Sequence, residues 1–246
     1  MLKHLKHWFA GRANALRWKA VAEWAEDQGA QFKLIRDGQG FVVEHPDARP
    51  RAWRMEWGSS QRSYIEGPEL RIRCELKLSP ELQMMVVSRQ LMEQLEASVF
   101  EMYTDTLKTR VDTDTPEEVR WLVMFPKFAG FNTKLLRNRF GAVCMSKEAI
   151  ATWLQGPLGT ALEVASETGV LAKEPPMLML TQRGNLYLRF GLDEPDIEII
   201  EALLKLFEVA CAEAQRANTK IVEGGWPTTS SIAWQSQPGE DDPPRR

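Results

Sequence analysis

The chain has 246 residues, enough for one large domain or two small ones, and its 43% hydrophobic and 26% charged residues are typical of a globular protein. Its formal net charge of -3 argues against a dedicated nucleic-acid-binding protein, whose basic surface usually dominates its domain. The cysteines Cys74, Cys144 and Cys211 are too dispersed for a CxxC metal site and too few for a disulfide framework. Because the sequence has neither an apolar run of membrane-spanning length nor a secretory signal pattern, we expect a cytoplasmic protein.

Residues 1–12, MLKHLKHWFAGR, form a short basic segment in which Leu2, Leu5 and Phe9 share one face of a predicted helix. Such a segment suits two roles. It packs against the protein's own core or a second subunit, or it makes weak, reversible contact with a membrane surface. The pattern alone does not choose between them.

An amphipathic helix is predicted over residues 13–28, because apolar side chains recur at helical spacing and Gly29 is a typical helix end. Residues 31–36 and 40–44 then flank the Asp37-Gly38 turn, which is a strong hairpin signal. The chain is therefore expected to enter the fold as a helix followed by two antiparallel strands.

Residues 49–78 alternate apolar and polar side chains over 53–57, 62–66 and 70–78. This period of two predicts three antiparallel strands with one apolar face and one charged face. The charged face gathers Arg54, Arg62, Tyr64, Arg71 and Arg73, with Arg189 added if the second half of the chain pairs alongside.

Two interpretations of this charged face stay open. Guanidinium groups held on a rigid sheet are good bidentate receptors for phosphate or carboxylate, which predicts a surface for a small anion or an acidic partner. Opposite charges that face each other across strands also form a solvated charge ladder. The acids interleaved with the arginines are Glu56, Glu66, Glu69 and Glu75.

The middle of the chain is predicted to be mainly helical. One helix spans about 88–107, and residues 83–87 before it suit either a strand or the first helical turn. A second helix is predicted to begin with a capping box, in which Thr115 is the N-cap and Pro116 is the first helical residue. Glu118 is the acid whose side chain accepts from the backbone N–H of the N-cap residue.

After the cap residue Ser146, the sequence predicts a helix that breaks at Gly156-Pro157. A hairpin follows over residues 177–182 and 185–192. A long amphipathic helix is predicted over 195–217.

These elements predict an α+β fold, with antiparallel sheet and hairpins packed by amphipathic helices in one domain over residues 13–217. Residues 67–73 resemble 184–189, which suggests two diverged helix–strands–helix halves over about 13–110 and 140–217. Chance similarity between amphipathic strands explains the same likeness.

Residues 218–246 form a predicted Gly/Pro/Ser-rich tail whose end is expected to be disordered. Trp226 and Trp234 fall within it, although burial is the usual state of so large an apolar ring. No pattern in the sequence assigns them a role.

Residues 127–138 are predicted to be a loop with some helix. A second cluster of basic residues begins in this segment. A basic, aromatic loop suits single-stranded nucleic acid or anionic lipid. Phenylalanines anchored in the core, with solvated cations between them, give the same pattern. The basic residues are Lys127, Lys134, Arg137 and Arg139.

The segment Asp112-Thr-Asp-Thr115 matches the D-x-D-x-T pattern of haloacid-dehalogenase-type phosphotransferases, in which a metal lies between the two carboxylates. That chemistry needs the first aspartate at the end of a buried strand, and the preceding residues 108–111 do not read as one. Acids near a helix start are also favoured by the helix dipole. We identify no other catalytic, cofactor-binding or metal-ligating set.

The leading hypothesis is a cytoplasmic, non-enzymatic protein that binds a protein partner or a small anionic ligand through its Arg-rich face. One alternative is a metal-dependent phosphotransferase that uses Asp112 and Asp114. Another is a peripheral membrane protein held by residues 1–12. A homodimer is compatible with the long final helix, nucleic acid is not expected as a partner, and no cofactor is predicted.

Overall fold

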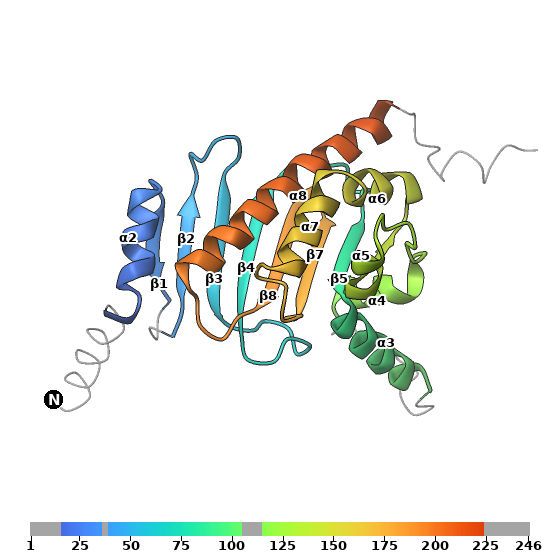
Figure 1. Ribbon diagram of the computed structural model, residues 1–246, viewed down its shortest axis with the longest axis horizontal. Helices are drawn as coiled ribbons and strands as arrows, with labels where there is room; N and C mark the ends of the chain where they lie inside the picture. The colour runs from blue at the N-terminus through green and yellow to red at the C-terminus, as the bar shows by residue number, and fades with distance from the viewer. Residues whose placement is uncertain (1–15, 36–38, 105–114, 224–246) are drawn as a thin grey trace, which may run out of the picture.

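The computed structural model describes residues 16–35, 39–104 and 115–223. Its strands are β1 (Gln31–Leu34), β2 (Phe41–His45), β3 (Trp53–Ser59), β4 (Pro68–Glu75), β5 (Met84–Ser88), β6 (Phe140–Cys144), β7 (Met177–Gln182) and β8 (Asn185–Gly191). Its helices are α2 (Lys19–Asp27), α3 (Arg89–Thr104), α4 (Glu117–Met124), α5 (Lys134–Arg139), α6 (Lys147–Leu154), α7 (Pro157–Glu167) and α8 (Ile197–Glu223). The predicted α+β fold is confirmed, and the described strands form one antiparallel sheet (Figure 1).

The strand order in the sheet is β1-β2-β3-β4-β8-β7-β5-β6. The first four strands lie side by side in chain order, and the C-terminal hairpin β7–β8 is inserted between β4 and β5. β4 and β8 pair directly, with Arg71 opposite Arg189. The two similar segments found in the sequence are therefore neighbours in the sheet, while their common origin stays a prediction.

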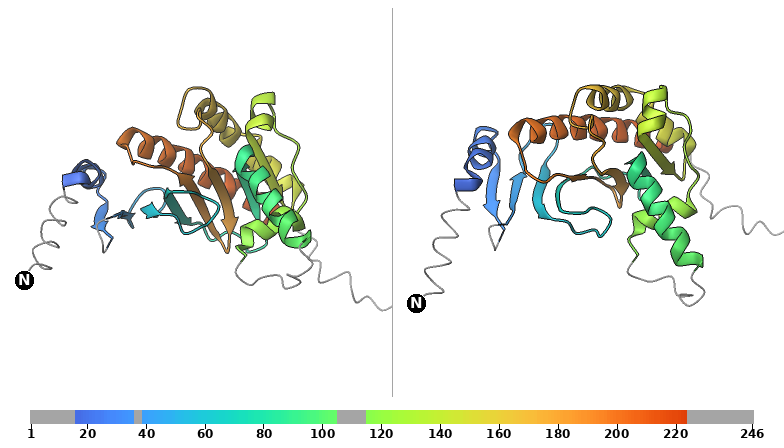
Figure 2. Two further views of the ribbon diagram at one scale, coloured as in Figure 1. Left: turned by 90° about the horizontal axis from the view of Figure 1, so that it is seen from below. Right: turned by 60° about the horizontal axis from the view of Figure 1, so that its bottom comes forward.

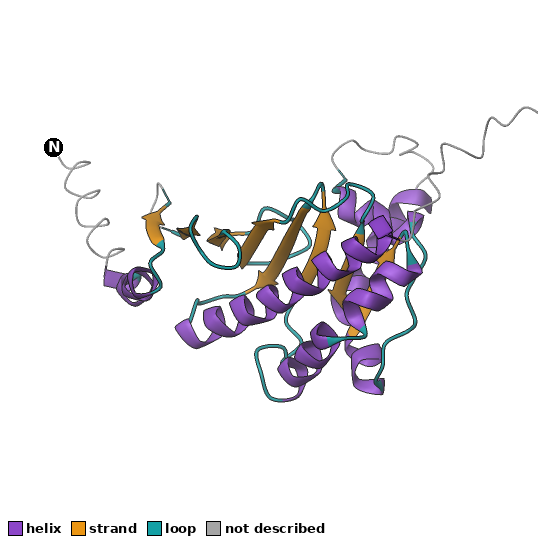
Figure 3. Ribbon diagram, turned by 90° about the horizontal axis from the view of Figure 1, so that it is seen from above, coloured by secondary structure: helices purple, strands orange, loops and turns teal. Residues whose placement is uncertain are grey.

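One face of the sheet is covered by α2, α6, α7 and α8, and the main hydrophobic core lies between these helices and the strands (Figure 3). α8 crosses this face and buries Leu203, Phe207 and Ala214. Trp153 of α6 is fully buried, and its indole N–H donates to the carbonyl oxygen of Ala210 at 3.0 Å. Packing and this hydrogen bond together fix α6 against α8.

The opposite face is only partly covered. α3 and α4 pack on apolar side chains of β5, β6 and β7, at one end of the sheet (Figure 2). We call the outward side of β3, β4 and β8, beyond these two helices, the open face. Its residues are Arg54, Glu56, Glu69, Arg71, Arg73, Glu75, Asn185, Tyr187 and Arg189.

Both predicted hairpins are present, as β1–β2 and β7–β8. The β7–β8 turn has positive φ angles at Arg183 (50°) and Gly184 (80°), the backbone that a two-residue hairpin turn requires. The predicted helix break at Gly156-Pro157 is also confirmed, since α6 ends before it and α7 begins at Pro157. α8 continues to Glu223, beyond the predicted end at residue 217.

The prediction of a strand over residues 62–66, the second of the three predicted strands, is wrong. Residues 60–67 form a loop, and β3 pairs directly with β4. The alternation in this segment reflects side chains that bind other parts of the protein, as described below. The N-terminal cap of α4 also differs from the prediction, because Pro116 occupies the N-cap position and makes no side-chain cap.

The sequence pattern does not predict β6, and the segment before α3 is compatible with either a strand or a helical turn. That segment is the strand β5. β6 is a short, fully buried edge strand paired with β5. Its outer edge is covered by the preceding segment, in which the backbone N–H of Phe128 donates to the carbonyl oxygen of Ala142 at 2.8 Å. A buried strand of this length has no alternation to reveal it.

Several predictions lie outside the described residues. These are the basic segment 1–12, the Asp37-Gly38 turn, Asp112 and Asp114, and the two tryptophans Trp226 and Trp234.

Candidate functional site

The register of the sheet arranges the charges of the open face in rows across the strands. Side chains directly opposite each other on neighbouring strands lie close enough to interact. The rows are Glu56–Arg71–Arg189 and Glu44–Arg54–Arg73–Tyr187. The predicted addition of Arg189 to the charged face is therefore confirmed.

A continuous ladder of ion pairs runs across this face and begins and ends with a cation. A hydrogen bond from Lys33 holds the pKa of Glu44 below its ordinary value. Burial raises the pKa of Glu56, but hydrogen bonds from Arg54 and Arg71 outweigh it and leave that pKa below its ordinary value. The pairs, in order, join Lys33 to Glu44 (2.7 Å), Glu44 to Arg54, Arg54 to Glu56 (2.5 Å), Glu56 to Arg71 (3.0 Å), Arg71 to Glu69 (2.9 Å) and Glu69 to Arg189 (2.8 Å).

Glu69 is the buried anchor of the ladder. Its residue is 0% exposed, and its cross-strand partners are Gly58 and Gly191, which leave room for the arginine side chains beside it. Its Oε1 also accepts a hydrogen bond from the backbone N–H of Gln61 at 2.9 Å. Glu69 therefore fixes the two arginines that bind it and ties the loop 60–67 to the sheet.

Arg62 and Tyr64, both predicted as binding residues, lie in this loop and point to α4. Arg62 Nε and the Tyr64 hydroxyl donate to Oε1 of Glu118 at 2.5 and 2.8 Å. Burial raises the pKa of Glu118, which is 2% exposed, but the bond from Arg62 outweighs it and leaves the pKa below its ordinary value. Burial, together with Glu118, raises the pKa of Tyr64. Arg62 and Tyr64 therefore attach the loop 60–67 to α4 and do not contribute to the open face.

Arg73 differs from the other arginines of the open face, because it is exposed and has no carboxylate partner within the described part of the chain. Arg54 lies opposite it on β3 and Tyr187 opposite it on β8. The Tyr187 hydroxyl accepts from the Asn185 amide at 3.2 Å, which leaves its own hydrogen free to donate. Arg71 Nε is also buried without a partner among the described atoms.

Two adjoining hollows lie over Arg73, with volumes of about 230 and 550 Å³. They share Arg54, Arg73 and Tyr187, and basic side chains outnumber acidic ones in their combined lining. Lys77 and Arg183, which no sequence pattern singles out, line the larger hollow. The alternation of side chains along β8 indicates that Tyr187 and Arg189 share one face of the sheet. Lys77 and Arg183 lie outside the strands, so no such alternation could reveal them.

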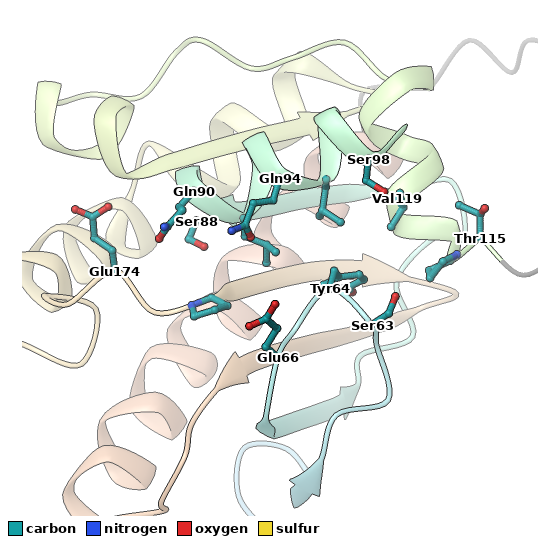
Figure 4. A pocket seen from close by; sticks show the side chains of 14 residues that line it. Ser63, Tyr64, Glu66, Ser88, Gln90, Gln94, Ser98, Thr115, Val119 and Glu174 are labelled. Carbon is teal, nitrogen blue, oxygen red and sulfur yellow. The ribbon is translucent and has the colours of Figure 1, made fainter. Parts of the chain in front are cut away.

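A separate groove of about 620 Å³ lies between α3, the loop 60–67 and the start of α4 (Figure 4). Gln90, Gln94 and Ser98 follow one line of α3, opposite the loop. The buried Leu91 and Leu95 also line the groove. Among the described residues, none that lines the groove is a lysine or an arginine. Its lining combines amides and hydroxyls with the carboxylates of Glu66 and Glu174, which does not suit an anion.

The second basic cluster is dispersed among different partners. Lys127 pairs with Glu96 at 2.9 Å, and Arg139 pairs with Glu174 at 2.9 Å. An Arg137 N–H donates to the carbonyl oxygen of Phe131 at 3.0 Å, and Lys134 is exposed at the start of α5. Three of these four cations are thus held by the protein itself.

The chain matches no protein-family model and no curated protein. Among the described residues, no group of three or more histidine, cysteine, aspartate or glutamate side chains could hold a metal ion. The described helices include none with the length and apolar character needed to cross a membrane. The open face around Arg73 is therefore the best-defined candidate site.

Proposed function

We propose that the protein binds a small anionic ligand through a phosphate or carboxylate group seated at Arg73 on the open face. The observation that supports this proposal is the isolation of Arg73. The other open-face arginines each hold a carboxylate, whereas Arg73 holds none within the described residues. Its guanidinium can therefore offer two parallel N–H donors to an incoming oxyanion.

The surroundings of Arg73 favour an anion in two ways. The ion-pair ladder compensates the charges of Arg54 and Arg71 but fixes their side chains, so little side-chain freedom is lost when they frame a ligand at Arg73. The Tyr187 hydroxyl can donate a further hydrogen bond to the same ligand group, because Asn185 already occupies its oxygen.

The shape of the site supports a small molecule more than an acidic protein surface. The larger hollow, of about 550 Å³, lies in the size range of small-ligand sites, and the smaller hollow, of about 230 Å³, adjoins it. Glu44 and Glu75 also line the larger hollow, so a ligand that extends into it should carry a neutral or cationic group there.

The test is isothermal titration of the purified protein with pyrophosphate and, separately, with citrate. Arg73→Gln should weaken binding by about tenfold or more, because a hydrogen bond to a charged group contributes roughly 1.5–3 kcal/mol. Arg120→Gln is the matched control: Arg120 is exposed on α4, has no ion pair among the described residues, and loses the same charge.

The control should change the dissociation constant by less than about twofold, since an exposed charge at a distance is screened by salt. Equal losses in the two variants would show that only net charge matters and would refute the assignment to Arg73. Wild-type protein that binds neither anion at millimolar concentration would refute the proposed function itself.

A further inference from the structure

The groove between α3, the loop 60–67 and the start of α4 is lined by polar side chains that the fold itself does not use. Gln90, Gln94 and Ser98 make no hydrogen bond within the described part of the chain, and Glu66 on the opposite wall makes no ion pair there. Figure 4 shows the Gln94 amide and the Glu66 carboxylate facing each other across the groove. A concavity of about 620 Å³, within the size range of ligand sites, therefore collects free donors and acceptors.

Ser88, at the end of the groove where α3 begins, adds a free donor that is almost buried. Its residue is 5% exposed, and its Oγ accepts a hydrogen bond from the backbone N–H of Met177 at 3.2 Å. The hydroxyl hydrogen has no acceptor among the described residues. Because a buried donor without an acceptor costs free energy, a ligand acceptor at this position would be favoured.

The free groups on α3 are spaced like the peptide groups of an extended chain. Gln90, Gln94 and Ser98 are four residues apart, so at a helical rise of about 1.5 Å per residue they repeat every ~6 Å. An extended chain repeats every two residues, at about 6.6 Å. Leu91 and Leu95 repeat beside this row with the same helical spacing. Alternate peptide groups of a bound chain can therefore meet the polar row while alternate side chains lie over the leucines.

The charge of the groove favours a basic ligand. Glu174, at one end, is paired with Arg139 at 2.9 Å, whereas Glu66 has no cationic partner among the described residues. The described lining contains no lysine or arginine that could compensate Glu66. Glu66 is therefore a free negative charge that a cationic side chain of the ligand can neutralise, which gives the groove electrostatic complementarity to a basic partner.

We propose that this groove binds an extended, basic peptide segment of a partner protein. The side-chain amides of Gln90 and Gln94 exchange hydrogen bonds with its peptide groups, and Glu66 binds one of its lysine or arginine side chains. A peptide supplies both the N–H donors and the carbonyl acceptors that a glutamine amide requires. A polyamine supplies only donors, so it would leave the amide N–H groups of both glutamines without acceptors.

The test is titration of the methyl-labelled protein with the acetylated and amidated peptide Ala-Lys-Val-Lys-Ala-Lys, followed by NMR. In an extended chain the lysines of this peptide lie on one side and its apolar residues on the other. The methyl resonances of Leu91 and Leu95 should shift and saturate, while those of Leu203 in the core on the other side of the sheet should stay unchanged. The same peptide with glutamate in place of lysine should cause no shift.

Two variants separate the contributions of charge and of hydrogen bonding. Glu66→Gln should weaken binding of the lysine peptide by about threefold, the effect expected for an ion pair at an exposed site. Gln94→Ala should weaken it by about fivefold, the effect expected for a neutral hydrogen bond. Glu167→Gln and Gln28→Ala are the matched controls, since both residues are exposed, lie outside the groove and should change the affinity by less than about twofold.

Three results would overturn the proposal. The first is a wild-type protein whose Leu91 and Leu95 resonances do not respond to millimolar lysine peptide. The second is equal weakening by the control variants, which would mean that the groove is not the binding site. The third is spermidine binding with the same shifts and affinity, which would mean that peptide groups contribute nothing. The wild-type titration is decisive even if a variant folds poorly. The groove lining includes neither Arg73 nor Tyr187, so this result is independent of the anion-binding result.

Discussion

Substituting Glu118 by glutamine should destabilise the protein, because Glu118 is the buried partner of both Arg62 and Tyr64. Breaking a buried ion pair from one side typically costs about 3–5 kcal/mol, since the remaining charge loses its compensation. Arg62 keeps 31% exposure and can be partly rehydrated, which places the expected loss nearer about 2–3 kcal/mol.

The same substitution at the neighbouring residue is the control. Glu117 is 28% exposed, and its partner Arg183 is 81% exposed at a distance of 3.5 Å. A solvated pair of this kind contributes about 0–1 kcal/mol, so Glu117→Gln should have little effect. The two variants change the same chemical group at adjacent positions of one helix and differ in burial.

The loss should also depend on pH in a defined direction. The folded-state pKa of Glu118 lies below its unfolded value, so its contribution is present above the unfolded pKa of about 4.3 and is lost as pH falls through the folded pKa. The difference between wild type and Glu118→Gln should therefore be full near neutral pH and shrink in acid.

Urea unfolding followed by the fluorescence of the nine tryptophans measures these differences. Equal stabilities for the Glu117 and Glu118 variants would refute the reasoning that burial decides the effect. A difference that stays constant from neutral to acidic pH would show that the ionised form of Glu118 is not what stabilises the loop.

Two further predictions concern the core. Burial raises the pKa of Cys144 to about 11, so the stability that depends on this thiol is present below its unfolded pKa and is lost as pH rises toward the folded value. Between roughly pH 8.5 and pH 11, the free energy of unfolding of Cys144→Ala should therefore fall by about 2–3 kcal/mol less than that of the wild type. Urea unfolding under reducing conditions at several pH values measures this fall, and an equal fall in both proteins would contradict the prediction. Gly159→Ala in α7 should destabilise by about 1–2 kcal/mol despite the better helix propensity of alanine, because the added Cβ would clash with the carbonyl oxygen of Leu154. A rise in melting temperature for Gly159→Ala would show that α7 can shift to accommodate the methyl group.

The fold class could be predicted because periodicity in this sequence reflects which faces are buried. The alternation in β3, β4 and β8 follows a sheet with one helix-covered side, and the spacing in α8 follows its contact with that side. β6 could not be found in this way, because both of its sides are buried and its edge is covered by a neighbouring segment. Its five residues therefore carry no repeating signal.

The candidate site was predicted only in part, for a related reason. Alternation between Arg62 and Glu66 resembles a strand, yet the pattern arises because Arg62 and Tyr64 bind Glu118 of α4. That contact spans more than fifty positions of sequence, and no local pattern encodes it. The pairing of β4 with β8, which brings Tyr187 beside Arg73, is a long-range contact of the same kind.

Arginines that look equivalent in the sequence thus differ in what surrounds them, and the difference makes stability and binding separable. Arg62 is bound to a buried acid that no solvent ion can easily replace, so Glu118→Gln should lower stability and leave anion affinity nearly unchanged. Arg73 is exposed and makes no ion pair among the described residues, so no stabilising ion pair depends on its charge. Arg73→Gln should therefore weaken anion binding without lowering stability. Loss of both properties in both variants would mean that the loop 60–67 and the open face respond as one unit, and that the ladder through Glu69 couples them.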